Sequence, residues 1–169
     1  MEKNTENAIN VAKSMMDTSA MCRYNVRSNY SCYDYFYSFT NENINAYTEL
    51  IDNNPQSALT VLASGDQPYN LITKGILDID TFDINLMTEF YALGLKRAMI
   101  LKYNHDEFIN IVLKIMRYQF TIEEEIEFII DLLPYMDTEY RLFWKTIVDY
   151  FIKLISNVSI SNIPFVIKL

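Results

Sequence analysis

The pattern of hydrophobic and polar positions places short apolar runs near the middle of the chain and amphipathic helical repeats on both sides. Two runs, Ala58–Ala63 and Ile79–Ile84, predict strands, because each is short, apolar or β-branched and bounded by turn residues. We expect the first of them to be covered on both faces, as nearly continuous apolar strands usually are. Apolar spacing and capping residues predict helices over 6–21, 40–52, 66–75, 85–103, 106–118, 121–133 and 138–155. Phe165–Leu169 predicts a third strand.

The stretch from Ala58 to Asn104 organises these elements as strand, glycine turn, helix, strand and helix. This order predicts a helix-rich α/β fold with a partial Rossmann-like parallel sheet of two or three strands and flanking helices. We expect a single domain over 1–169. It would comprise a helical and aromatic lead-in (1–57), a nucleoside-binding βαβα unit (58–104) and a helical region with a terminal strand (105–169).

The turn at Gly65 and the acid Asp83 form the pair with the clearest chemical meaning. Their separation is close to the roughly 20 residues between a nucleotide-binding glycine turn and the acid that accepts ribose hydroxyls. Only one glycine of the G-x-G-x-x-G pattern is present, which favours a nucleoside without phosphates, and S-adenosylmethionine is the candidate. The alternative is an ordinary turn followed by a solvated acid at a strand end.

The segments LTVLASGDQPYNLITKG, FDIN and ALGLKRAMI resemble the nucleoside-binding half of class I S-adenosylmethionine-dependent transferases. More narrowly, they resemble a bacterial family related to the enzyme that moves a 3-amino-3-carboxypropyl group from S-adenosylmethionine to diacylglycerol in betaine-lipid synthesis. Gly94 stands where that family has an acid. The resemblance implies cofactor contacts from Ser64 and Gly65 in the turn, and from Asp66 and Gln67 near the amino-acid part of the cofactor. After the second strand, it implies Asp83 on the ribose and Asn85 near the adenine or the strand end.

An unusually aromatic segment, Cys22–Phe39, precedes this unit. One interpretation is that it closes over the ligand, with Arg27 or Arg23 reaching the amino-acid carboxylate of the cofactor, as a bidentate guanidinium can. The other is an aromatic cluster that fixes a loop to the core, since tyrosines bury a large area and satisfy their own hydroxyls easily.

Composition and charge limit the classes of partner. The net charge of −8 and the isoelectric point near 4.6 argue against general binding to nucleic acid or to anionic membranes, which needs clustered basic side chains. Cys22 and Cys32 match neither a redox motif nor a zinc set, so we expect reduced cysteines and no metal. The polar amino terminus and the lack of an apolar run of about 18 residues predict a soluble, cytoplasmic protein without a transmembrane segment.

Other candidate features have simpler structural interpretations. His105 could supply a base and the acidic run Glu123–Glu127 could supply paired carboxylates. The expected roles are a solvated or capping histidine and a solvated first helical turn. The apolar face of helix 138–155 predicts packing on the sheet or a homo-oligomer contact. Asn162–Phe165 reads NIPF and resembles the element by which adenine-N6 methyltransferases of RNA and DNA hold their target.

The sequence therefore predicts an S-adenosylmethionine-dependent transferase that moves a 3-amino-3-carboxypropyl or methyl group to a lipid or small-molecule acceptor. No residue is assigned as a catalytic base. A complete transferase sheet has roughly seven strands. The interpretation that the chain is a truncated member of the family, an N-terminal fragment, therefore stays open. The main alternative is a non-catalytic helical interaction protein built on a vestigial nucleoside-binding unit, and the minor one is an adenine-N6 nucleic-acid methyltransferase.

Overall fold

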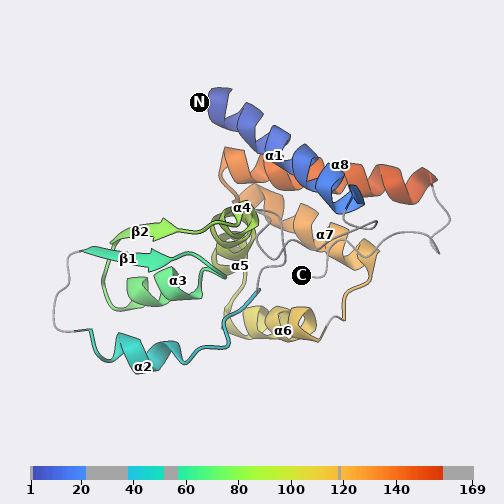
Figure 1. Cartoon of the computed structure of the whole chain (residues 1–169). Helices are drawn as coiled ribbons and strands as arrows, with labels where there is room; N and C mark the ends of the chain where they lie inside the picture. The colour runs from blue at the N-terminus through green and yellow to red at the C-terminus, as the bar shows by residue number, and fades with distance from the viewer. Residues whose placement is uncertain (1, 22–37, 52–56, 118, 158–169) are drawn as a thin grey trace. The chain divides into compact units, whose positions relative to one another are not determined.

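The computed structural model of the chain describes residues 2–21, 38–51, 57–117 and 119–157 (Figure 1). Their elements in chain order are α1 (Glu2–Met21), α2 (Ile44–Thr48), β1 (Ser57–Val61), α3 (Asp66–Thr73), β2 (Asp78–Phe82), α4 (Leu86–Glu89), the π-helix η1 (Phe90–Lys96), α5 (Arg97–Lys102), α6 (His105–Met116), α7 (Ile122–Leu132), the 3₁₀ helix η2 (Leu133–Tyr135) and α8 (Thr138–Asn157). These elements confirm a helix-rich α/β chain.

The described residues form two compact units. The first combines the described parts of Met1–Arg27 and Gly94–Leu169, and the second is the described part of Ser28–Leu93. The boundary lies within η1, so the predicted nucleoside-binding stretch 58–104 contributes residues to both units.

The second unit is built around one β-α-β crossover. Strands β1 and β2 are parallel, in a register that pairs Ser57 with Asp78 and Val61 with Phe82. The ladder continues for one further hydrogen bond, from the backbone N–H of Leu62 to the carbonyl of Phe82 (2.9 Å). The two predicted parallel strands are thus confirmed, each starting one residue and ending two residues earlier than expected. The predicted third strand, Phe165–Leu169, lies outside the described residues.

One face of this two-stranded sheet is covered and the other is exposed. Helix α3 packs on β1 and α2 packs on α3, so the unit is layered sheet, helix, helix (Figure 1). The opposite face carries Leu59 and Phe82, which are 72% and 59% exposed. The expectation that the first strand is covered on both faces is wrong for the described part of the chain, because Leu59 and Val61 on this face of β1 are exposed.

The first unit is centred on the pair formed by α1 and α8, which lie side by side (Figure 1). On α1, Ala8 and Ala12 are buried. On α8, Trp144, Ile147 and Phe151 are buried. The apolar face of helix 138–155 therefore packs against α1 and α7 of the same chain.

The absence of an acid at Gly94 has a steric reason. A β-carbon at this position would lie 2.9 Å from Cβ of Tyr140 and 3.1 Å from Nε1 of Trp144, both on α8. Such contacts are closer than side chains allow, so η1 and α8 can meet here only through a glycine. Packing within the first unit thus excludes the acid that the resemblance leads one to expect.

Two predicted helix starts have different outcomes. Thr121 and Glu124 form the expected capping box at the start of α7. The helix expected to begin at Thr40 begins instead at Ile44 and is shorter. The reason is that Thr40 takes part in other bonds: its backbone N–H donates to Oδ2 of Asp66 (2.7 Å) and its hydroxyl accepts from the N–H of Glu42 (3.1 Å).

Candidate functional site

The turn after β1 requires a glycine at position 65. Gly65 has φ +82°, in the left-handed region, and its N–H donates to the carbonyl of Leu62 (2.7 Å). A β-carbon there would lie 2.9 Å from Cβ of Ala92 and 3.1 Å from Cε2 of Tyr69. The space that the missing side chain leaves is thus filled by the protein itself, and Gly65 contributes the shape of the turn.

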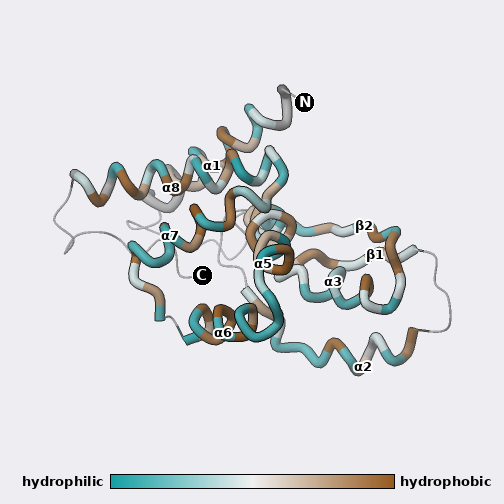
Figure 2. The backbone as a smooth tube through the Cα atoms, turned by 180° about the vertical axis from the view of Figure 1, so that it is seen from behind, coloured by the Kyte–Doolittle hydropathy of each residue, from teal (hydrophilic) through white to brown (hydrophobic). Residues whose placement is uncertain are grey.

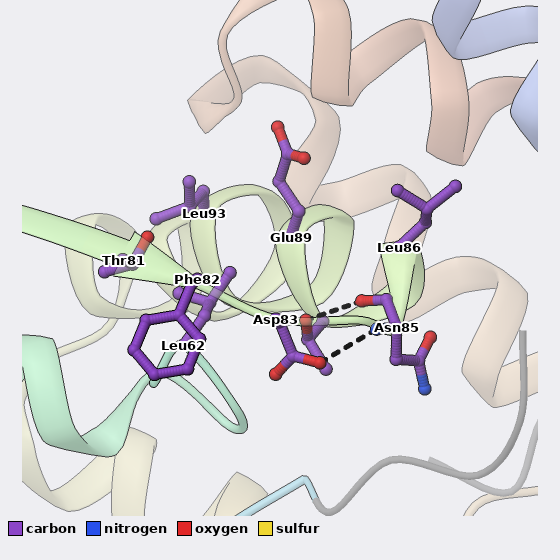
Figure 3. Close-up of a pocket in the computed structure, with 9 residues that line it drawn as sticks. Leu62, Thr81, Phe82, Asp83, Asn85, Leu86, Glu89 and Leu93 are labelled. Carbon is purple, nitrogen blue, oxygen red and sulfur yellow. Dashed lines mark hydrogen bonds between the residues drawn. The ribbon is translucent and has the colours of Figure 1, made fainter. Parts of the chain in front are cut away.

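Asp83 joins the end of β2 to this turn. Its Oδ2 accepts a hydrogen bond from the N–H of Ala63 (2.9 Å), and its Oδ1 accepts one from the N–H of Asn85 (2.9 Å; Figure 3). The structure therefore brings together the two features that the sequence pairs by spacing. A carboxylate oxygen has two lone pairs, so each oxygen of Asp83 can accept one further hydrogen bond.

A pocket of about 380 Å³ opens beside Asp83. It is lined by Leu62, Thr81, Phe82, Asp83, Asn85, Leu86, Thr88, Glu89 and Leu93, most of which Figure 3 labels. In that view the carboxylate of Asp83 and the amide of Asn85 extend to one side of the backbone, and the side chains of Leu86 and Glu89 extend to the other. The volume lies within the range of small-molecule sites. The pocket contains two of the predicted site residues but none of Ser64–Gln67.

Three polar residues of the pocket were missed by the sequence analysis: Thr81, Thr88 and Glu89. The last two follow the cap residue Asn85, whose Oδ1 accepts from the N–H of Met87 (2.9 Å) at the start of α4. Helical spacing from this cap could have placed Thr88 and Glu89 beside the strand end. Asn85 itself acts as the helix cap that the sequence predicts.

Ser64 and Asp66 hold the lead-in segment against the turn. The buried hydroxyl of Ser64 donates to Oδ2 of Asp66 (2.7 Å), the same oxygen that accepts from the N–H of Thr40. This carboxylate oxygen is therefore engaged in binding residues of its own chain. Its position next to the amino-acid part of a cofactor stays a prediction.

Gln67 presents a buried acceptor that the described residues leave unsatisfied. Its side chain is 7% exposed, and its Nε2 donates to Oε2 of Glu42 (3.3 Å). Its Oε1 is buried without a hydrogen-bond partner in the described part of the chain. A flipped amide would set two oxygens against each other at Glu42, so this orientation is fixed. Burying an unpaired acceptor costs about 1–3 kcal/mol, which a donor from a ligand would offset.

Two tyrosines close the back of the turn. The hydroxyl of Tyr91 donates to the carbonyl of Ser38 (2.8 Å), and the hydroxyl of Tyr69 donates to the carbonyl of Ala92 (2.7 Å). Burial, with a smaller contribution from Asp66, raises the pKa of the Tyr91 hydroxyl far above its usual range, so it stays a donor. Tyr91, Asp66 and Gln67 thus fix the segment around Thr40 to the turn, while Tyr69 binds the turn to η1.

The remaining candidates lie elsewhere or outside the described residues. Arg27, Arg23 and both cysteines fall in a part of the chain that the structure does not describe, as does Asn162–Phe165. The side chain of His105 is 86% exposed and lies 3.1 Å from Asp106, at the start of α6. Among the described residues, no cluster of His, Cys, Asp and Glu could hold a metal ion, and no helix is long and apolar enough to cross a membrane.

Within the acidic run, Glu125 differs from its neighbours. Glu123, Glu124 and Glu127 are exposed, but burial raises the pKa of Glu125 to about 7. The folded chain therefore binds a proton at Glu125 that the unfolded chain has lost above about pH 4.5. The contribution of the Glu125 carboxyl to the free energy of unfolding is complete at low pH and is lost as pH rises toward 7.

We therefore expect Glu125→Gln to stabilise the first unit at about pH 8 by about 1–2 kcal/mol, because the amide removes the cost of burying a charge. This value includes a reduction for the screening of the partly exposed side chain by water. The gain should shrink on moving to about pH 5.5, where the native carboxyl is protonated. Urea unfolding at both pH values measures it, and Glu123→Gln on the exposed side of the same turn serves as the control. A gain that is independent of pH, or equal in the control, would refute the burial of Glu125.

The geometry thus joins Gly65, Asp83 and Asn85 at the carboxyl edge of the sheet, with Ser64, Asp66 and Gln67 on the adjoining side of the turn. Comparison of the chain with protein-family models, with curated proteins and with solved structures finds no match.

Proposed function

We propose that the chain is an S-adenosylmethionine-dependent transferase that holds its cofactor at the carboxyl edge of β1 and β2. The observation that carries the proposal is the position of Asp83. It follows a parallel strand, hydrogen-bonds to the turn after the neighbouring strand and lines a pocket. Nucleosides bind at this edge in open α/β sheets, with a strand-end acid on the ribose hydroxyls.

The described residues fit the polar groups of such a cofactor. Asp83 can accept the ribose hydroxyls with its remaining lone pairs, and Asn85 lies next to it in the pocket, on the side proposed for adenine. Across the turn, the unsatisfied Oε1 of Gln67 is suited to accept from the amino group of the methionine part. A primary ammonium has three donors, so it can satisfy this oxygen and still bind water.

When bound, the cofactor would supply a sulfonium whose attached carbons are electrophilic, so that either a methyl or an aminocarboxypropyl group can be transferred. The work of this chain would then be to bind and orient, which provides much of the rate in such reactions. We propose a lipid or a small molecule as the acceptor and assign no base.

Isothermal titration of the full chain with S-adenosylhomocysteine tests cofactor binding, and heat with saturable binding is the expected result. Adenosine and 2′,3′-dideoxyadenosine then test the ribose contact without altering the protein. Loss of hydrogen bonds to a charged group costs about 1.5–3 kcal/mol, so the dideoxy compound should bind about 10- to 150-fold more weakly. Equal affinities would refute the role of Asp83, and no heat with any of the three ligands would refute the cofactor.

A second candidate is an interaction protein without turnover, built on the same β-α-β unit. The exposed face of the sheet, with Leu59 and Phe82, favours it because sheets of transferases are covered on both sides. Product analysis separates the candidates. Methylthioadenosine would indicate aminocarboxypropyl transfer and S-adenosylhomocysteine would indicate methyl transfer. Binding of the cofactor without either product would favour the interaction protein.

The adenine-N6 alternative rests on Asn162–Phe165, and methylation of adenine in RNA or DNA would test it.

A further inference from the structure

Helix α6 carries an apolar stripe that remains exposed in the part of the chain that the structure describes. Ile109, Leu113 and Met116 are 42%, 38% and 60% exposed, and they recur at helical spacing on one side of the helix. The opposite interior side holds the buried Ile115, and hydrophobic positions run along the length of α6 (Figure 2). Among the described residues α6 has only sparse contacts with other elements. The stripe is thus available for a partner.

The charges of α6 are arranged by sign along its axis. Asp106 and Glu107 lie in the first turn, while Lys114 lies in the last turn and Arg117 caps the helix. Asp106 and Arg117 are separated by about three helical turns, so they project on the same side of the helix, next to the apolar stripe. Both are exposed.

We propose that α6 is a self-association surface on which two copies of this chain pack their α6 helices antiparallel. In a two-fold arrangement centred between Ile111 and Val112, the stripes of both copies face each other. Asp106 of each copy then lies opposite Arg117 of the other, because antiparallel helices bring equivalent flanks together. A parallel pair would instead bring the two acidic first turns together at one end and the two basic last turns together at the other, so the charge pattern favours the antiparallel pair.

The same pattern argues against a membrane as the occupant. Helices that lie on membranes are rich in Lys and Arg on their polar face. α6 instead carries two acidic residues, Asp106 and Glu107, in addition to the basic Lys114 and its cap Arg117. The whole chain has a net charge of −8. Because one helix pair is a small interface, we expect a weak dimer, with dissociation in the micromolar range or above.

Sedimentation equilibrium of the full chain over a range of concentrations tests the proposal, with a reversible monomer-dimer equilibrium as the expected result. Leu113→Asp should shift it toward monomer by more than about tenfold in the dissociation constant, since it places two buried charges at the contact. Ile152→Asp on α8 is the matched control, because Ile152 is 46% exposed in the same unit, and it should leave the equilibrium unchanged.

Charge reversal tests the orientation of the pair. Asp106→Arg and Arg117→Asp should each weaken the homodimer by about tenfold, since two attractive contacts become repulsive. An equimolar mixture of the two variants should dimerise as well as the wild-type chain, because both opposite-charge contacts are restored in the heterodimer. A strictly monomeric chain, a dimer that survives Leu113→Asp, a mixture that stays monomeric, or binding of the chain to anionic vesicles through α6 would each overturn the proposal.

Discussion

Gly65→Ala is expected to lower the free energy of unfolding of the second unit by about 2–5 kcal/mol. A non-glycine residue in the left-handed region costs about 1–2 kcal/mol, and overpacking adds about 1–3 kcal/mol. The second contribution arises because the new methyl would meet Ala92 at 2.9 Å and the ring of Tyr69 at 3.1 Å. Hydrogen exchange of the amides in α3 and β2, followed as a function of urea concentration, measures the stability of this unit separately.

Gly75→Ala is the matched control for the backbone contribution. Gly75 has φ +84°, nearly the same as Gly65, but nothing lies within 4 Å of a β-carbon built there. The variant should therefore lose only the conformational cost of about 1–2 kcal/mol. Equal losses at the two glycines would mean that Ala92 and Tyr69 do not close the turn, and the proposed packing of η1 behind it would be wrong.

Asp83→Ala is expected to destabilise the same unit by about 2–4 kcal/mol, because the N–H groups of Ala63 and Asn85 lose their acceptor together. Hydrogen bonds to charged groups contribute about 1.5–3 kcal/mol each, and water can replace part of this at a half-buried site. The amides of Ala63 and Asn85 should exchange faster than in the wild-type chain, and the same urea series gives the loss of stability.

Asp80→Ala provides the comparison for Asp83, since Asp80 is an exposed acid on β2. Surface substitutions of this kind usually change stability by less than about 0.5 kcal/mol. Similar behaviour of the two variants would contradict the bridging role of Asp83. The expected difference also explains why the ribose contact is tested with altered ligands: substitution of Asp83 changes the turn and the binding site together.

Local signals predicted the elements that position the site. The spacing of Gly65 and Asp83 indicated a glycine turn facing a strand-end acid, and the structure joins them through the N–H of Ala63. Asn85 and Thr121 were identified as caps because their side chains bond to the backbone a few residues on, which is readable from the sequence alone. Such features depend on neighbours in sequence.

Contacts between distant segments could not be predicted in this way. The bond from Thr40 to Asp66 and the packing of Tyr69 against Ala92 depend on how α3 and η1 meet, which no periodicity reveals. Gly94 is a similar case, because only the approach of α8 explains why a side chain is excluded. The exposed face of the sheet was missed because an apolar strand predicts coverage but not the helices that provide it.

The most direct test of the central proposal is a two-dimensional NMR titration of the isotope-labelled full chain with S-adenosylhomocysteine. We expect the amide signals of Leu62–Gln67 and Asp83–Glu89 to shift, because the proposed contacts of Asp83, Asn85 and Gln67 lie in these segments. The side-chain amide of Gln67 should also shift, while the signals of α6 should stay in place. An unchanged spectrum, or shifts confined to residues outside the two segments, would contradict the proposed site.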